Sequence, residues 1–131
     1  MTPPSAGGAR IVVPIHGGAD VLVACLESLA RTLPADAHVE LVDDASPDPA
    51  IAGILRGHQA IAPHRVSIVH QRDNLGFVRT VNAAFARAAG GDVILLNSDT
   101  VTTRGWYERI LACATSDPRI ATATPFSNNA E

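Results

Sequence analysis

The chain has 131 residues, 47% of them hydrophobic and 18% charged, a length and composition suited to one domain with its own core. Ten basic residues against thirteen acidic ones give a net charge of −3, which excludes a basic surface for general nucleic-acid binding. All ten basic residues are arginines, so the composition also excludes lysine Schiff-base chemistry and a phosphate-loop lysine.

The first residues, 1–9, are mostly Pro, Ser, Gly and Ala, and this composition predicts a flexible lead-in before a single unit at 10–131. The start lacks the apolar core of a signal sequence, and no apolar run approaches the ~18 residues of a membrane span. We therefore expect a cytoplasmic protein with no transmembrane segment.

Short apolar runs rich in β-branched residues alternate along the chain with segments of helical periodicity. The runs predict strands at 10–15, 39–42, 66–69 and 93–96, and the periodic segments predict helices at 20–33, 50–60, 76–89 and 103–115. A further strand is predicted at 120–124. The expected inward faces are Phe77, Val81, Ala84, Phe85 and Ala88 on the third helix and Trp106, Ile110 and Ala114 on the last. Repeated strand–helix alternation predicts an open, mainly parallel Rossmann-like α/β sheet in the strand order 3-2-1-4, with helices on both faces.

Polar residues follow the end of each of the first four predicted strands, at His16–Gly18, Asp43–Asp44, Gln71–Gly76 and Asn97–Asp99. In an open α/β sheet the ligand crevice lies beyond the carboxyl ends of the strands. An ordinary loop between strand and helix needs a cap and a turn residue rather than paired carboxylates. The four ends together therefore predict a binding site at this rim.

The carboxylates at the rim leave two interpretations open. Asp99 follows the most apolar strand, where a carboxylate is costly unless it is paired or metal-bound. It is either a Mg²⁺ or Mn²⁺ ligand, with water and substrate phosphates completing the shell, or the N-cap or loop acceptor of the next helix. Asp43 and Asp44 either cap the turn at Ser46–Pro47 or accept the N–H of a pyrimidine base or a ribose hydroxyl.

Five segments in order resemble the N-terminal half of family 2 glycosyltransferases, which have the GT-A fold. They are Ile11–His16, Cys25–Leu29, Val42–Ser46, Asn74–Phe77 leading to Asn82, and Leu95–Asp99. Pro125–Asn129 further resembles rhamnosyltransferase-like members that build bacterial surface polysaccharides. Each motif alone is weak, but their order and spacing are specific, and the resemblance covers residues 10–131.

The resemblance implies a nucleotide site. It would be formed by Pro14, Ile15, His16, Gly17, Asp43, Asp44, Arg72, Asn74, Gly76, Phe77, Asn97 and Ser98. In this site Asp44, with Asp43 beside it, would bind uracil or thymine and position the loop at 74–77, which would close over the nucleoside. Arg72 would reach a phosphate.

The segment Asn97–Asp99 occupies the place of the family's Asp-x-Asp metal motif. Asn97 stands where the first Asp is expected, so the motif has one negative charge fewer. Asp99 is then the remaining carboxylate ligand of a divalent cation, Mn²⁺ or Mg²⁺, that arrives with the nucleotide diphosphate.

The implied function is the donor-binding part of a glycosyltransferase that moves a sugar from a nucleotide diphosphate-sugar, UDP- or dTDP-linked, to an acceptor in cell-surface polysaccharide synthesis. The alternative is a non-catalytic module that binds nucleotide-sugars. A sugar nucleotidyltransferase fits less well, because its glycine-rich loop should follow the first strand, whereas Gly7–Arg10 precede it.

In the family an acidic catalytic base lies in a C-terminal half that binds the acceptor. The sequence stops at Glu131, so we expect no catalytic residue within it, a base beyond Glu131, and no activity from this chain alone. We also expect self-association through apolar surface that the further half would cover. The resemblance places the longer protein in the cytoplasm or at the inner face of the membrane.

The remaining titratable residues show no ligand spacing. We expect His38, His58, His64 and His70 at the surface or at strand ends, and Cys25 and Cys113 as small buried thiols.

Overall fold

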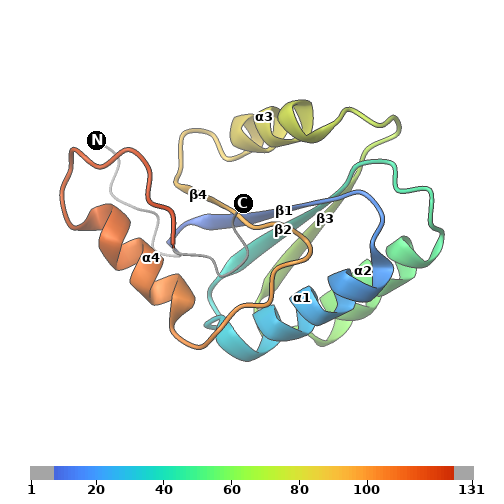
Figure 1. Ribbon diagram of the computed structural model, residues 1–131, viewed down its shortest axis with the longest axis horizontal. Helices are drawn as coiled ribbons and strands as arrows, with labels where there is room; N and C mark the ends of the chain where they lie inside the picture. The colour runs from blue at the N-terminus through green and yellow to red at the C-terminus, as the bar shows by residue number, and fades with distance from the viewer. Residues whose placement is uncertain (1–7, 126–131) are drawn as a thin grey trace.

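A computed structural model describes residues 8–125 as one parallel sheet in the order β3-β2-β1-β4, with helices on both faces (Figure 1). The elements are β1 (Arg10–Ile15), α1 (Ala19–Thr32), β2 (His38–Asp43), α2 (Ala50–Ile61), β3 (Arg65–His70), α3 (Phe77–Arg87), β4 (Val93–Leu95) and α4 (Trp106–Thr115). All three strand pairings are parallel. The predicted open α/β sheet and its strand order are confirmed.

The register of the strands determines which residues reach the carboxyl rim together. Ile15 lies opposite Asp43, and Asp43 lies opposite His70, so β1, β2 and β3 end at one level. β4 ends earlier, because Leu95 lies opposite Val12. The chain continues beside β1 after that point, with the Leu96 amide donating to the Val12 carbonyl at 2.9 Å. Residues 97–99 are thereby delivered to the same rim.

The main core lies between the sheet and the helices α1 and α2, which Figure 1 shows on one side of the strands. Ile11 and Val13 of β1 pack in one cluster with Leu22 and Leu29 of α1, and all four are fully buried. Burying one such side chain contributes about 1.5–3 kcal/mol to the stability of the fold. The buried residues of α1 follow the helical spacing from which this helix was predicted.

Within residues 8–125, the opposite face of the sheet is covered by α3 and has a smaller core (Figure 1). The predicted inward face of α3 is only partly right: Val81 and Ala84 are buried, but Phe77 and Phe85 are 58% and 46% exposed. Thr80 is the third buried residue of the helix. The small side chains face the sheet because α3 lies close over β1 and β2, and this leaves the two rings at its flanks.

A half-buried ion pair lies on the α3 face. Glu40 of the central strand β2 is 3% exposed, and Arg87 of α3 donates from Nε to its Oε1 at 2.6 Å. A carboxylate on this face is tolerated because the arginine compensates its charge.

One prediction for the C-terminal part is wrong. Residues 120–124 form no strand, because no described strand lies beside them and the Ile120 amide instead closes a turn onto the Asp117 carbonyl. Leu95 of the apolar strand β4 is 42% exposed, because β4 is the edge of the described sheet and α3 does not cover it.

Helix α4 begins at Trp106, three residues later than predicted, because Gly105 has a φ of +85° and ends the preceding turn. Trp106 and Ile110 pack against the main core as expected. Ala114 is half-buried, and the residue that α4 buries most deeply is Tyr107, which the helical pattern did not indicate. Pro125–Asn129, apart from Pro125, lies outside the described residues.

The expected lead-in at 1–9 lies mostly outside the described residues, and its last residue, Ala9, is buried in the core. Within residues 8–125, no helix is both long enough and apolar enough to cross a membrane.

The expectations for histidine and cysteine hold in part. His38 and His70 lie at strand ends and Cys25 is buried, as predicted, whereas Cys113 is exposed because it lies on the outer face of α4. The prediction is wrong for His58 and His64, which are 7% and 6% exposed. The two form a ring pair with centroids 5.2 Å apart, because His58 lies on the buried face of α2.

The buried histidine pair predicts a fall in stability on acidification. Burial lowers the pKa of His58 from 6.5 to about 4 and also lowers that of His64, so the unfolded chain binds more protons than the folded one between these values. The free energy of unfolding should therefore be highest above pH 6.5. It should decrease toward pH 4, by at most about 1.4 kcal/mol per pH unit for each histidine.

Urea denaturation at pH 7.5, 6 and 5 measures this slope. His58→Phe should flatten it, whereas Arg56→Gln, at an exposed position on the same helix, should leave it unchanged. An unchanged slope in His58→Phe would contradict the assignment.

Candidate functional site

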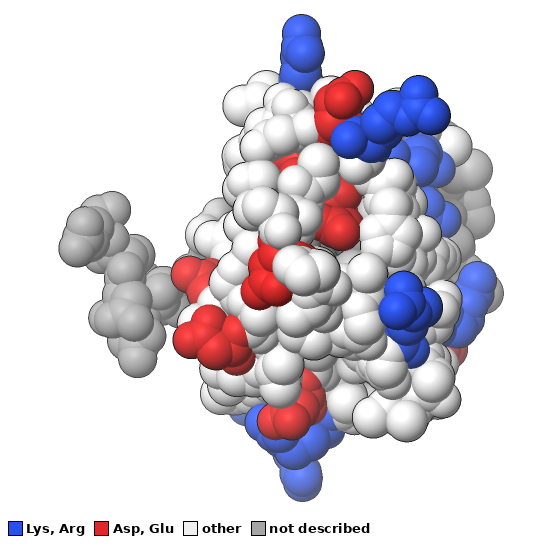
Figure 2. Space-filling model, turned by 90° about the vertical axis from the view of Figure 1, so that its right-hand side faces the viewer, with Lys and Arg blue, Asp and Glu red and all other residues white. Residues whose placement is uncertain are grey.

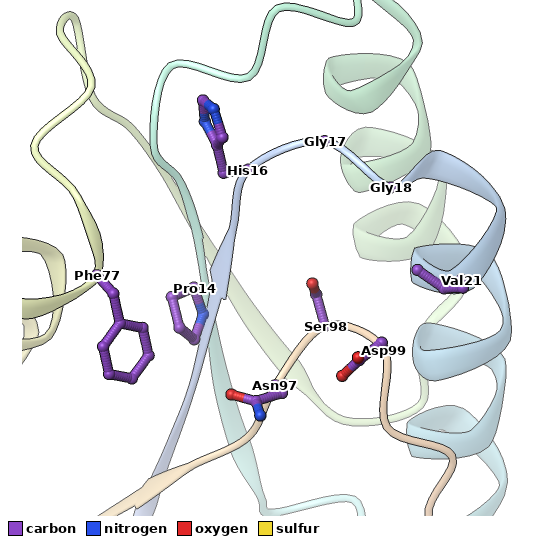
Figure 3. A pocket seen from close by; sticks show the side chains of 9 residues that line it. All are labelled: Pro14, His16, Gly17, Gly18, Val21, Phe77, Asn97, Ser98 and Asp99. Carbon is purple, nitrogen blue, oxygen red and sulfur yellow. The ribbon is translucent and has the colours of Figure 1, made fainter.

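A shallow pocket of about 320 Å³ lies at the carboxyl ends of β1 and β4, near the lower limit of about 300 Å³ for ligand pockets. It is lined by Pro14, His16, Gly17, Gly18, Val21, Phe77, Asn97, Ser98 and Asp99 (Figure 3). Seven of the thirteen residues predicted for the nucleotide and the metal are therefore brought together. The other six are Ile15, Asp43, Asp44, Arg72, Asn74 and Gly76, and they do not line the pocket.

The turn from β1 into α1 forms one wall of the pocket and depends on two glycines. Gly17 and Gly18 have φ values of +81° and +69°, which residues with a Cβ adopt at a cost. A Cβ on Gly18 would lie 3.1 Å from Cγ2 of Val21. The Gly17 amide donates to Ser46 Oγ at 3.0 Å, which fixes this turn to the loop after β2.

Asp43, the last residue of β2, stabilises the turn that follows this strand at the carboxyl rim. Its Oδ1 accepts the Ser46 amide at 2.9 Å and its Oδ2 lies 3.2 Å from His70 Nδ1. Burial opposes its ionisation, but the hydrogen bonds from Ser46 and His70 outweigh this effect and lower the pKa of Asp43 below its ordinary value. Asp43 thus caps the turn at Ser46, one of the two roles that the sequence left open.

Asp44 holds the loop at 71–76. Its carboxylate, in a residue 5% exposed, accepts the Leu75 amide at 2.7 Å, the Gly76 amide at 2.9 Å and Gln71 Nε2 at 2.7 Å. The loop-positioning part of the predicted role is therefore present in the geometry. Contact between Asp44 and a base stays a prediction.

The side chains that assist Asp44 in holding this loop were not predicted. Gln71 donates from Nε2 both to Asp44 and to Oγ1 of Thr80, the fully buried threonine of α3, at 3.0 Å. A signal was available, since a glutamine directly after a strand and a threonine inside an apolar helix face are both polar groups that need partners.

A second tie joins the loop to β1. His16 contacts the Asp44 carbonyl through Nδ1 at 2.9 Å, and its Nε2 lies 3.3 Å from Asn74 Nδ2. We assign Nδ1–H as the donor, which leaves Nε2 to accept from the amide. Asn74 Oδ1 accepts the Gly76 amide at 2.9 Å, and Gly76 has a φ of +82°. This arrangement delivers the next residue, Phe77, to the pocket edge facing Pro14 (Figure 3).

Two predicted residues lie away from the pocket. The Ile15 side chain is buried in the main core, so only its backbone reaches the rim, where its carbonyl accepts the Asp44 amide at 2.8 Å. Arg72 is exposed and forms none of the ion pairs found among residues 8–125.

Charge is unevenly distributed over the rim. Figure 2 shows the molecule from the side to which the strands point, with acidic side chains near the middle and arginines at the margins. A bare diphosphate is repelled by such a centre, whereas a cation, or a diphosphate that carries one, is attracted.

The segment after β4 forms the remaining wall. The Thr100 amide closes a turn onto the Asn97 carbonyl at 3.1 Å, and Asp99 lies exposed in this turn. Asp99 is not the N-cap of α4, because that helix is preceded by Gly105. Burial raises the pKa of the nearby Cys25 thiol to about 11, and the negative charge of Asp99 adds to the shift, so the thiol stays protonated.

The donor set at Asp99 suits only one kind of cation site. Residues 8–125 contain no cluster of three or more His, Cys, Asp or Glu able to hold a metal ion. Asp99, Ser98 and Asn97 all line the pocket, and their carboxylate, hydroxyl and amide oxygens are the kind of ligand that Mg²⁺ and Mn²⁺ accept. In Figure 3 the Ser98 hydroxyl points towards the Gly17 turn and away from the Asp99 carboxylate, so Asp99 is the principal candidate ligand. These residues fit a cation that keeps most of its shell as water and ligand phosphates.

Comparison with known structures supports the fold. A mannosyltransferase from Pyrobaculum calidifontis, PcManGT, superposes with a TM-score of 0.69 at 22% identity over 84% of this chain and 32% of its own. GalNAc-T7 gives a TM-score of 0.69 at 19% identity, over 83% of this chain and 21% of its own. TarS from S. aureus gives 0.67 at 22% identity, over 79% and 31%. At these identities the likeness shows the open α/β fold of GT-A glycosyltransferases.

Sequence comparison gives the family. Glycosyltransferase GlyG from Streptococcus pneumoniae is 26% identical over 100 residues, which are 76% of this chain and 33% of GlyG. The chain thus spans about a third of the length of this curated relative. The sequence model described as Glycosyl transferase family 2 matches residues 10–131. Since this match covers nearly the whole chain, the chain belongs to glycosyl transferase family 2.

Proposed function

We propose that this chain binds the donor of a sugar-transfer reaction, a nucleoside diphosphate-sugar accompanied by a divalent cation. The observation that carries the proposal is the convergence of Asn97, Ser98 and Asp99 with the β1 turn and Phe77 on one pocket at the carboxyl rim. The titles of similar structures support it: PcManGT is in complex with GDP-Man and Mn2+, GalNAc-T7 with UDP, GalNAc and Mn2+, and TarS with UDP.

The base and ribose lie, in this proposal, over residues 14–17 and against the loop that Asp44 holds. Phe77, exposed at the pocket edge, supplies apolar contact to the nucleoside. The diphosphate extends toward Asp99. Arg72, which does not line the pocket, would reach a phosphate from the margin of the rim. UDP and dTDP are the proposed nucleotides, and Mn²⁺ or Mg²⁺ the proposed cation.

The chain's own part in the reaction is to bind and orient the donor. Asp99 and the neighbouring oxygen donors hold the cation against the diphosphate, and the loop at 71–76 fixes the nucleoside end. When bound, the cation supplies Lewis-acid stabilisation of negative charge on the leaving diphosphate. The surface that binds the acceptor, and the base that activates the acceptor's hydroxyl, belong in this proposal to a part of the enzyme outside this chain. The enzyme acts in cell-surface polysaccharide synthesis, in the cytoplasm or at the inner face of the membrane.

A non-catalytic nucleotide-sugar-binding module remains the second candidate. The observation that favours it is the single carboxylate, since Asn97 stands where a second acidic ligand is expected. Both candidates predict nucleotide binding, and only the first predicts transfer.

We expect this chain alone to transfer no sugar from UDP-sugars and to self-associate in sedimentation at high concentration. The two candidates are distinguished by assaying a longer protein that includes the sequence encoded downstream. Sugar transfer by the longer protein would support the enzyme, whereas nucleotide-sugar binding without transfer would support the non-catalytic module.

Replacing Asp99 by Asn tests the cation site. The substitution keeps the size of the side chain and removes its charge at an exposed position, so stability should change by less than about 0.5 kcal/mol. Cation and nucleotide should bind cooperatively in the wild type, each raising the affinity of the other by one factor, and the variant should lose that factor.

Calorimetric titration of UDP, once in the presence of Mn²⁺ and once in the presence of a chelator, measures this cooperativity factor. Asp73→Asn, another exposed acid of the rim that does not line the pocket, should retain the metal dependence. Retention of the metal dependence in Asp99→Asn would rule out Asp99 as the ligand.

Replacing Asp44 by Asn tests the nucleoside end. The new amide group faces backbone N–H donors, so at least one hydrogen bond to the loop is lost, at a cost of about 1–3 kcal/mol in stability. UDP binding should weaken by the same factor with Mn²⁺ and with chelator, because the metal end of the pocket is intact. Asp48→Asn, at an exposed turn, serves as the control. A loss of UDP affinity that occurs only in the presence of Mn²⁺ would contradict the assignment of Asp44 to the nucleoside end.

A further inference from the structure

Buried hydroxyl groups lie beneath the segment that carries Asp99. On α1, Ser28 and Thr32 face this segment, and we call the pair the α1 hydroxyl ledge. The Thr102 amide donates to Ser28 Oγ at 3.0 Å, and Thr102 Oγ1 lies 3.0 Å from both Ser28 Oγ and Thr32 Oγ1. Trp106 Nε1 donates to Thr32 Oγ1 at 3.0 Å. Ser28 is fully buried and Thr102 is 8% exposed.

The ledge fixes one end of a short length of chain whose other end is fixed by the sheet. Leu96 is bonded to Val12 of β1 at 2.9 Å, and Thr102 is bonded to Ser28. Between them, the Asn97 carbonyl accepts the Thr100 amide and lies 3.9 Å from Cys25 Sγ. Figure 1 shows the whole segment running beside α1 on its way to α4.

The Asp99 side chain has no such support of its own. Among residues 8–125 it takes part in none of the hydrogen bonds or ion pairs that the structure contains, and it is exposed. The direction of its carboxylate into the pocket (Figure 3) therefore depends on the backbone between Leu96 and Thr102. A single carboxylate that binds a cation loses affinity in proportion to the time it spends pointing elsewhere.

We propose that Thr102 is a positioning residue for the cation: seated on the α1 hydroxyl ledge, it holds Asp99 in the orientation that binds the metal–diphosphate end of the donor. The inference rests on the proposed function, since it assigns Thr102 a part in that same site. It gives the buried hydroxyl groups a role in binding beyond their contribution to stability.

The test compares the metal response of nucleotide binding, defined as the dissociation constant of UDP in chelator divided by that in Mn²⁺. Thr102→Val keeps the shape of the side chain and removes its hydroxyl, and it should lower the metal response about tenfold, as loss of a group that supports a metal ligand does. UDP affinity in chelator should stay unchanged. Thr102→Ser restores the hydroxyl and should recover the response.

The matched control is Thr115→Val, at an exposed position of α4 that does not line the pocket, which should leave the metal response at the wild-type value. In the Asp99→Asn background, Thr102→Val should have no further effect, because it acts through Asp99. Should circular dichroism show that Thr102→Val does not fold, Ser28→Ala, which removes the acceptor of the Thr102 amide, decides the question with the same expected loss.

The outcomes separate the two proposals. A wild type without any metal response overturns the cation site of the proposed function. A wild type with a metal response that folded Thr102→Val or Ser28→Ala retains overturns the positioning role and leaves the proposed function standing. A lower melting temperature with an unchanged metal response likewise limits Thr102 to stability.

Discussion

The carboxylate of Asp44 is the interaction on which the rim depends. Residues 71–76 have no strand or helix to define their path, and three donors from this loop converge on one side chain at the end of β2. An ionised carboxylate is the strongest common acceptor for backbone amides, so the loop is held without any secondary structure of its own. The position of Phe77, and with it one wall of the pocket, follows from this single anchor.

The opposite wall is built differently. Neutral hydroxyl groups of α1, rather than a charge, hold the segment between β4 and α4. The proposed nucleoside end and the proposed metal end of the pocket are therefore supported by separate elements, the first by β2 and the second by α1. Independent support explains why substitutions at the two ends are expected to affect binding in different ways.

The sequence was sufficient for the fold and for seven of the nine residues that line the pocket, for identifiable physical reasons. Apolar β-branched runs and helical spacing are local signals, and the strand-end rule then places His16 and Asn97 at one rim. The face of α3 was only partly predictable, because the close approach of the helix to the sheet, which favours small side chains such as Ala84 at the contact, is not a local signal. The alternation of apolar and polar residues at 120–124 is typical of a strand, but a strand forms only beside another strand, and the alternation does not show whether one is present. Ser28 and Thr102 are 74 positions apart, and no local pattern links them.

Four glycines with positive φ values flank the pocket segments: Gly17, Gly18, Gly76 and Gly105. They set the bends of the backbone, so the loops keep their course whatever side chain occupies Phe77 or Ser98, two lining positions whose side chains hold no loop in place. Evolutionary change at these two positions therefore alters the size and polarity of the pocket while its scaffold is retained, whereas exchanging one of the four glycines strains a bend of that scaffold.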